Sequence, residues 1–239
     1  MNEYPILFST EMVKAILDGR KTQTRRVIKP QLSSKILGGV TIQGYGNEFH
    51  FPTYDTEYPV EVRKCPYGAH GDLLYVREKW GVDRIKVGDG YEYPNVLYRA
   101  DSTTKLIICD EVWDYYEKDN FKWRPSIHMP KAFARIWLRV KDVRVERVQD
   151  ISQDDAIAEG IDMESEHASL CINIEDAGYD NDLVRGSAAF TIFKTLWNSI
   201  NEKRGYGWDT NPWVWVVEFE RVEHDFDGRE VDAEDEALG

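Results

Sequence analysis

Apolar and polar residues alternate most regularly between Ala134 and Val148, which is the pattern of a β-strand with one buried face. The apolar positions are Ile136, Leu138, Val140, Val143 and Val145. The alternation changes phase at Lys141-Asp142, so we expect a kink in the strand at this point.

Two segments carry apolar residues at helical spacing, one between Thr10 and Gly19 and one over residues 190–200. Their apolar stripes are Met12, Val13, Ile16 and Leu17 in the first segment, and Phe190, Phe193, Trp197 and Ile200 in the second. Gly19 is a typical residue just after the end of a helix. A third, short helix is predicted from Ser152 to Gly160, because Ser152 is a good N-cap and Asp155 stands in the capping-box position.

Short apolar runs predict further strands, at residues 6–8, 73–76, 96–100 and 213–221. Long polar and glycine-rich stretches separate them, and we expect loop insertions near 31–70 (with a hairpin at Val40–Gln43), 102–125 and 162–186. There is no internal repeat and no regular βαβ order. The pattern predicts a single α+β domain over residues 1–222, with a small, mainly antiparallel β-sheet or β-barrel, flanking helices and long insertions.

The net charge of -13 is unevenly distributed along the 239 residues. The segment 223–239 has eight acidic residues against one arginine, and we expect it to be a flexible, solvated tail. Residues 14–35 contain seven lysines and arginines but only one acid, Asp18. A basic segment in an acidic protein indicates either a local site for an anionic ligand or a solvated face.

Composition also limits the class of protein. No apolar run approaches the length of a membrane span, and the first residues have no signal-peptide pattern. Three scattered cysteines indicate reduced thiols, so we expect a cytoplasmic protein without a membrane partner. Cys65 and His70 are too few for a structural zinc site, and we predict neither a metal nor another cofactor.

The segment from Gly19 to Arg26 carries the most specific chemistry. A lysine in a desolvated pocket loses its proton more readily and can act as a base, and a threonine hydroxyl beside it can act as a nucleophile. A turn beside Gly19 would bring Lys21 and Thr24 together. The alternative is an ordinary surface strand whose cations face solvent.

Glu159 is a second candidate. It stands in the last turn of the predicted short helix, where the helix dipole disfavours a carboxylate by roughly 0.3–1 kcal/mol. A nearby cation or a catalytic role would explain it, and so would simple exposure to solvent.

The motif Gly19-x-Lys21-x-x-Thr24-x-Arg26 after a short helix resembles the signature of ASCH domains, relatives of the PUA fold, whose usual pattern is G-x-K-x-x-E-x-R. Segments 71–78, 152–160 and 213–219 agree with this resemblance, and residues 6–30, Met129-Pro130 and Asn211-Pro212-Trp213 look like a phage or prophage subgroup. The resemblance implies a PUA-like barrel and recognition of a nucleoside or an exposed base of single-stranded RNA. It does not cover the three insertions.

The threonine at position 24 departs from the broad family and resembles the small bacterial N4-acetylcytidine amidohydrolases. The resemblance implies a catalytic set of Lys21 as general base, Thr24 as nucleophile and Glu159 as the residue that holds the lysine or moves its proton. The residues expected to bind the ligand are Gly19, Arg20, Arg25 and Arg26.

Two other functions remain open. The same cations can serve a non-catalytic RNA-binding module, in which an aromatic residue such as Tyr45, Trp80, Trp123 or Trp208 stacks on a base. The insertions and the acidic tail can instead belong to a phage accessory or morphogenesis protein that acts through protein partners.

Overall fold

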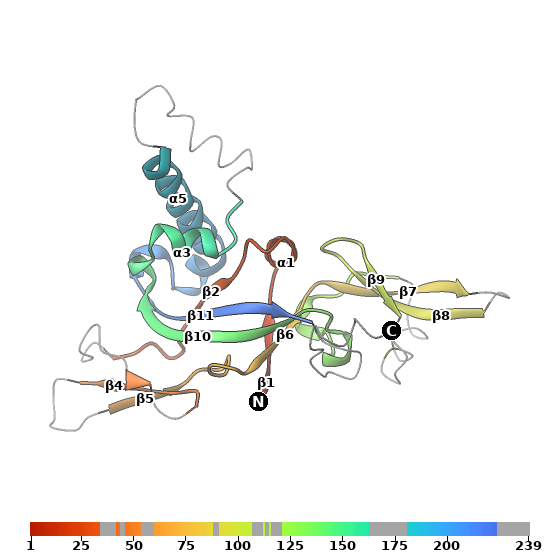
Figure 1. Cartoon of the computed structure of the whole chain (residues 1–239), viewed down its shortest axis with the longest axis horizontal. Helices are drawn as coiled ribbons and strands as arrows, with labels where there is room; N and C mark the ends of the chain where they lie inside the picture. The colour runs from red at the N-terminus through yellow and green to blue at the C-terminus, as the bar shows by residue number, and fades with distance from the viewer. Residues whose placement is uncertain are drawn as a thin grey trace, which may run out of the picture. The chain divides into compact units, whose positions relative to one another are not determined.

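A computed structural model of the chain describes residues 1–33, 42–43, 46–53, 60–87, 91–106, 112, 115, 121–162 and 181–223. Contacts between residues divide the chain into two compact units. The first contains Met1–Lys14, Leu73–Arg139 and the described residues after Glu220, and the second contains Ala15–Asp72 and Val140–Glu220. Figure 1 labels the helices and strands.

The largest sheet has five strands in the order β1-β6-β10-β11-β2. Their bounds are Glu3–Leu7 for β1, Leu73–Arg77 for β6, Trp137–Arg147 for β10, Trp213–Val222 for β11 and Gln23–Val27 for β2. β1 pairs with β6 in parallel, whereas β10 with β6 and β11 with β2 are antiparallel. The long strand that the sequence predicts is confirmed as β10, and its buried positions change phase between Val140 and Val143, across the exposed Lys141 and Asp142.

Two smaller antiparallel sheets have three strands each, in the orders β3-β4-β5 and β7-β8-β9. Their bounds are Ile42–Gln43, Glu48–Pro52 and Val60–Lys64 in the first, and Trp80–Val87, Tyr91–Tyr98 and Thr104–Leu106 in the second.

The prediction of an irregular insertion over 31–70 is wrong where β4 and β5 form. Phe49 and Phe51 alternate with polar residues on β4 and are both buried, so the alternation of a strand is present among the glycines and prolines of this stretch. The second predicted insertion likewise contains β9. The predictions for residues 163–180 and for the tail from 224 lie outside the described residues.

Three α-helices are described: α1 (Thr10–Leu17), α3 (Gln153–Ala158) and α5 (Asn181–Asn201). The predicted start and end of α1 are confirmed, and Gly19 follows it in the left-handed region with φ of 74°. The predicted cap of α3 is also confirmed, because Ser152 Oγ accepts a hydrogen bond from the Asp155 backbone N–H at 3.1 Å.

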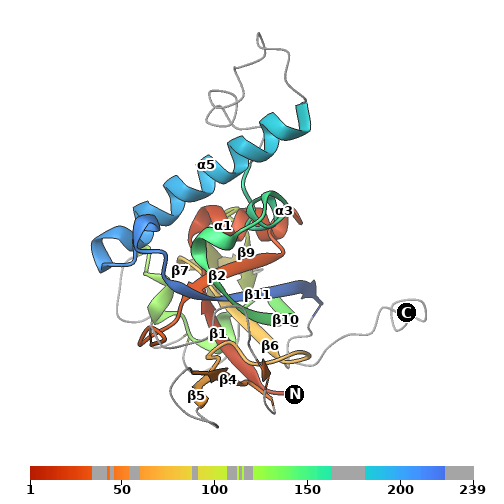
Figure 2. The ribbon, with the colours of Figure 1, turned by 90° about the vertical axis from the view of Figure 1, so that its left-hand side faces the viewer.

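In the second unit, α3 and α5 cover one face of β2 and β11 (Figure 2). The core between them contains Ala156, Phe193, Trp197, Trp208, Val214 and Val216. This packing fixes α3 over β2, and so determines which side chains of β2 meet the end of α3.

The fold is α+β with mostly antiparallel sheets, as the sequence predicts. Strand pairing among the described residues leaves β1 and β2 as the two edges of the five-stranded sheet, so a closed PUA-like barrel stays a prediction. No helix in the described part of the chain is both long and apolar enough to cross a membrane.

Candidate functional site

The site lies in the second unit, where the chain that leaves α1 meets the end of α3. Lys21 donates its backbone N–H to the Ala15 carbonyl of α1 at 2.9 Å and forms an isolated antiparallel bridge with Glu159. The Thr22 backbone N–H donates to the Ala158 carbonyl at 2.9 Å. These bonds hold residue 21 against residue 159 although 138 positions separate them.

Gly160 permits this close approach. Its φ is 87°, and a Cβ atom on it would lie 2.7 Å from Lys21 Cβ and 2.9 Å from Ala15 Cβ. Real Cβ atoms essentially never approach so closely. Only glycine fits both the left-handed backbone and the space at this position.

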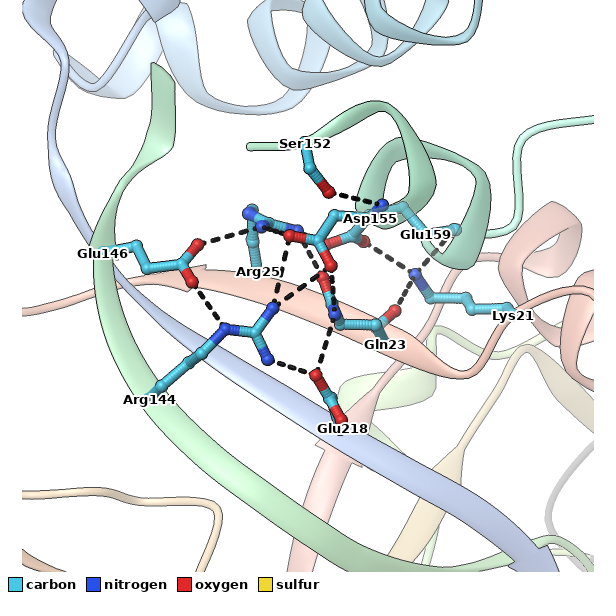
Figure 3. A network of polar contacts seen from close by, with 9 residues as sticks. All are labelled: Lys21, Gln23, Arg25, Arg144, Glu146, Ser152, Asp155, Glu159 and Glu218. Atoms are coloured by element: carbon cyan, nitrogen blue, oxygen red, sulfur yellow. Dashed lines mark hydrogen bonds and ion pairs between the residues drawn. The ribbon is translucent and has the colours of Figure 1, made fainter. Parts of the chain in front are cut away.

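The Lys21 side chain is fully buried, and that of Glu159 is 5% exposed. Lys21 Nζ donates to three oxygens: the Gln23 carbonyl at 2.8 Å, the Glu159 carbonyl at 2.8 Å and Glu159 Oε2 at 2.9 Å (Figure 3). Burial lowers the pKa of the Lys21 ammonium below its ordinary value of 10.5, and the Glu159 carboxylate opposes this only in part. The pair therefore combines a lysine of lowered pKa with an acceptor in hydrogen-bond contact.

Arg25 lies beside this pair with a side chain that is also fully buried. Its guanidinium contacts Glu159 Oε1 at 3.4 Å, Glu146 Oε2 at 3.0 Å and Asp155 Oδ2 at 2.8 Å, and it donates to Gln23 Oε1. Arg25 was predicted to bind the ligand, but its donors point to the protein's own carboxylates. Its position suits an internal support for Glu159.

Arg144 on β10 extends the network toward solvent. It forms ion pairs with Glu146, Asp155 and Glu218, and Gln23 Nε2 also donates to Asp155 Oδ1 at 2.9 Å (Figure 3). Burial alone would raise the pKa of the Asp155 carboxyl, but hydrogen bonds from Gln23 and Arg25 lower it to about 2. The Asp155 carboxylate is therefore the charged partner of both Arg25 and Arg144 at neutral pH.

Alternation along β2 separates the predicted residues onto two faces. Gln23 and Arg25 face α3 and the network, so Thr24 and Arg26 face the opposite side of the strand. Thr24 is buried and lies opposite Val217 of β11. The described hydrogen bonds of Lys21 and Glu159 do not include its hydroxyl.

The face of β2 that carries Thr24 also has aromatic residues. Arg26 lies opposite Trp215 of β11, and the Trp215 ring packs edge-on against Phe49 with centroids 4.9 Å apart. Burial lowers the pKa of the Arg26 guanidinium, and the charges of Tyr67 and Glu159 oppose that shift. The charge of Arg26 in turn lowers the pKa of Lys21, so it acts on the Lys21–Glu159 pair from this side.

The two remaining predicted residues hold the turn after α1. Gly19 provides its left-handed conformation, and Arg20 donates to the Gly160 carbonyl at 3.0 Å and to Asp18 Oδ2 at 2.8 Å. The contact of Arg20 with the Gly160 carbonyl links the two segments that carry Lys21 and Glu159.

Sequence reasoning missed the acidic half of the network. Glu146 on β10 and Glu218 on β11 alternate with apolar residues, and Asp155 stands in the first turn of α3, so their sequence pattern is that of a solvated surface. The missed members of the network are these three acids, together with Arg144 and Gln23.

The aromatic residues predicted to stack on a base differ in their placement. Trp80 and Trp208 are buried in hydrophobic cores, which excludes them as exposed stacking surfaces, because apolar neighbours cover their rings. Trp123 is only partly buried, and Tyr45 lies outside the described residues.

Among the described residues, no group of three or more His, Cys, Asp or Glu side chains has an arrangement that can hold a metal ion. Comparisons of the chain with models of protein families, with curated proteins and with solved structures found no match.

Proposed function

We propose that the protein recognises a nucleoside or an exposed RNA base beside β2 and hydrolyses an exocyclic amide, as in N4-acetylcytidine. The carrying observation is the Lys21–Glu159 contact of 2.9 Å between two buried groups, with the pKa of the lysine lowered. A lowered pKa is one of the conditions that general-base chemistry sets for a lysine.

In this proposal, Lys21 becomes neutral when it passes a proton to Glu159 Oε2. The Thr24 hydroxyl attacks the acetyl carbonyl carbon, and its proton passes to Lys21 Nζ, which requires the Thr24 side chain to move toward Lys21 from the opposite face of β2. The bond from the carbonyl carbon to N4 then breaks, and Lys21 returns the proton to the leaving amine. Water hydrolyses the resulting ester and releases acetate and free Thr24.

The substrate would approach from the face of β2 that carries Thr24 and Arg26, because the other face is filled by the network of Arg25. Trp215 and Phe49 are buried on that side, so neither ring is exposed for stacking on a base, and Arg26 lies opposite Trp215 on β11.

A second candidate is a non-catalytic base-binding module. The observation that favours it is the complete use of Lys21 Nζ, whose three hydrogen bonds all go to oxygens of the protein itself. In that case Lys21–Glu159 only joins β2 to α3, and binding without turnover is expected.

Incubation with N4-acetylcytidine separates the two candidates. The proposal predicts cytidine and acetate, and a loss of at least about 100-fold in turnover in both Lys21→Ala and Thr24→Ala. Thr24→Ser keeps a hydroxyl and should retain activity. Thr22→Ala is the matched control, because Thr22 is an exposed hydroxyl two residues away.

The result that contradicts hydrolysis is an absence of product at high protein concentration from a wild-type protein with a normal circular dichroism spectrum and melting temperature. Full activity in Thr24→Ala would contradict the assigned nucleophile.

A further inference from the structure

A second surface, on the first unit, has the composition of a nucleic-acid contact. The segment 121–124 runs beside the start of β7, because the backbones of Trp80 and Arg124 exchange hydrogen bonds at 3.3 and 2.7 Å. Its sequence alternates aromatic and basic residues: Phe121, Lys122, Trp123 and Arg124.

One face of this segment belongs to the core. The Arg124 guanidinium lies over the rings of Trp80 and Tyr115, at 5.6 and 4.8 Å from their centroids, and Trp80 is fully buried. Arg124 thus closes the hydrophobic core of this unit and is not part of the proposed surface.

The other face carries an aromatic pair. Phe121 is 43% exposed, and its ring packs edge-on against Trp123 with centroids 5.2 Å apart. A Cβ atom on Gly81 would lie 2.7 Å from the Phe121 ring, so Phe121 rests directly on the backbone of β7. The absence of a side chain at Gly81 is what lets the ring approach the strand this closely.

Cations surround this pair. Arg99 is exposed, and its guanidinium carbon lies 5.2 Å from the centroid of the Trp123 ring. The Arg99 backbone N–H donates to the Lys79 carbonyl at 2.9 Å, which places the exposed Lys79 next to it, and exposed Lys122 lies between the two aromatic residues.

The acids on this part of the unit leave a positive balance. Asp101 is engaged by Arg135 at 2.8 Å, and Glu78 is buried in contact with the same arginine. Asp83 on β7, which is exposed, and Glu92 on β8 are the acids of the described sheet that count against the three cations.

We propose that Lys79, Arg99, Phe121, Lys122 and Trp123, hereafter the aromatic–basic surface, bind single-stranded nucleic acid. A base stacks on the ring of Trp123 or Phe121, and the three cations contact the backbone phosphates. Exposed aromatic rings framed by cations match unpaired bases, whose flat faces are open, joined by phosphates of opposite charge. The inference goes beyond the proposed hydrolysis and does not depend on it.

Fluorescence anisotropy with labelled oligo-uridine and oligo-deoxythymidine of twelve nucleotides tests this surface on the full chain. Trp123→Ala and Phe121→Ala should each weaken binding by about tenfold or more. Contact with three phosphates predicts a slope of log K against log salt of about −2, and Arg99→Gln should reduce its magnitude by about 0.7.

Two matched controls accompany these variants. Ile127→Ala removes another exposed apolar side chain of the same unit, and Lys141→Gln removes one exposed cation of the other unit. Both should bind like the wild type.

Binding of either oligomer with these dependences supports the proposal, and the RNA and DNA arms show which sugar is preferred. The proposal is overturned if neither oligomer binds at low salt, or if Trp123→Ala binds as tightly as Ile127→Ala. Trp123→Phe keeps an aromatic ring and should bind with most of the wild-type affinity. Such binding shows that the loss in Trp123→Ala comes from the missing ring and not from misfolding.

Discussion

Replacing Glu159 with glutamine removes the charge from the buried contact of Lys21 and nearly preserves the size of the side chain. Lys21 keeps its hydrogen bonds to two backbone carbonyls but loses the carboxylate at 2.9 Å, while the charges of Arg25 and Arg26 stay nearby. Removal of one partner from a buried ion pair typically destabilises a protein by about 3–5 kcal/mol.

The loss of unfolding free energy in Glu159→Gln has an upper limit, because Lys21 can become neutral. Holding a lysine neutral costs about 1.4 kcal/mol for each pH unit below its unfolded pKa of 10.5, or about 5 kcal/mol at pH 7 and about 2 kcal/mol at pH 9. With a lowered pKa in the fold, the unfolded chain binds more protons in the window below 10.5, so stability rises with pH there. The destabilisation by Glu159→Gln should therefore be smaller at pH 9 than at pH 7.

Guanidinium unfolding followed by tryptophan fluorescence at both pH values measures this effect. Glu11→Gln is the matched control, because Glu11 forms a 3.6 Å pair with Lys14 on the surface of α1, where a pair contributes about 0.3–0.5 kcal/mol. The reasoning is refuted if Glu159→Gln costs no more than this control at pH 7, or if its cost is the same at pH 9.

Three further outcomes are expected. The double variant Lys21→Met, Glu159→Gln should lose less unfolding free energy than the two single variants lose together, because neither charge of the pair is left buried without the other. Additive losses in the same unfolding assay would show that the two residues are not coupled. Gly160→Ala should lower the free energy of unfolding by about 2–4 kcal/mol, through both backbone strain and steric overlap. Gly205 has a φ of 82° but nothing within 4 Å of a Cβ atom, so Gly205→Ala should lower it by only about 1–2 kcal/mol. Equal melting temperatures of the two variants would contradict the close contact at Gly160. Burial raises the pKa of the Cys65 thiol to about 12. In a chain with Cys109 and Cys171 replaced by serine, Cys65 should therefore resist a thiol reagent at pH 8 until the chain unfolds. Rapid labelling of the native protein would contradict the burial of Cys65.

The parts of the fold that the sequence predicts best are those with a strong local signal. α1 has an apolar stripe between a threonine and a glycine, and β10 has a long alternation, so each carries its own evidence. β4 and β5 were missed because their alternation covers only five residues each and lies among glycines and prolines, and their formation depends on pairing with each other.

The sequence likewise predicted only part of the candidate site. Lys21 and Glu159 were named from local context, and their contact agrees with the hypothesis that they act together. The role of Arg25 was not predictable, because it depends on carboxylates from β10 and α3 that approach only in the folded chain. The separation of Thr24 from the network follows from strand alternation, which places neighbouring residues on opposite faces.

The most direct test of the central claim is the pKa of the Lys21 ammonium, measured by NMR titration of lysines labelled with ¹⁵N at Nζ, with Lys21→Met used to assign the signal. We expect a value below 10.5 in the wild type and a still lower value in Glu159→Gln, where the opposing carboxylate charge is absent. A Lys21 pKa at or above that of the exposed lysines, unchanged by Glu159→Gln, would contradict both the burial of the pair and the base chemistry proposed for it.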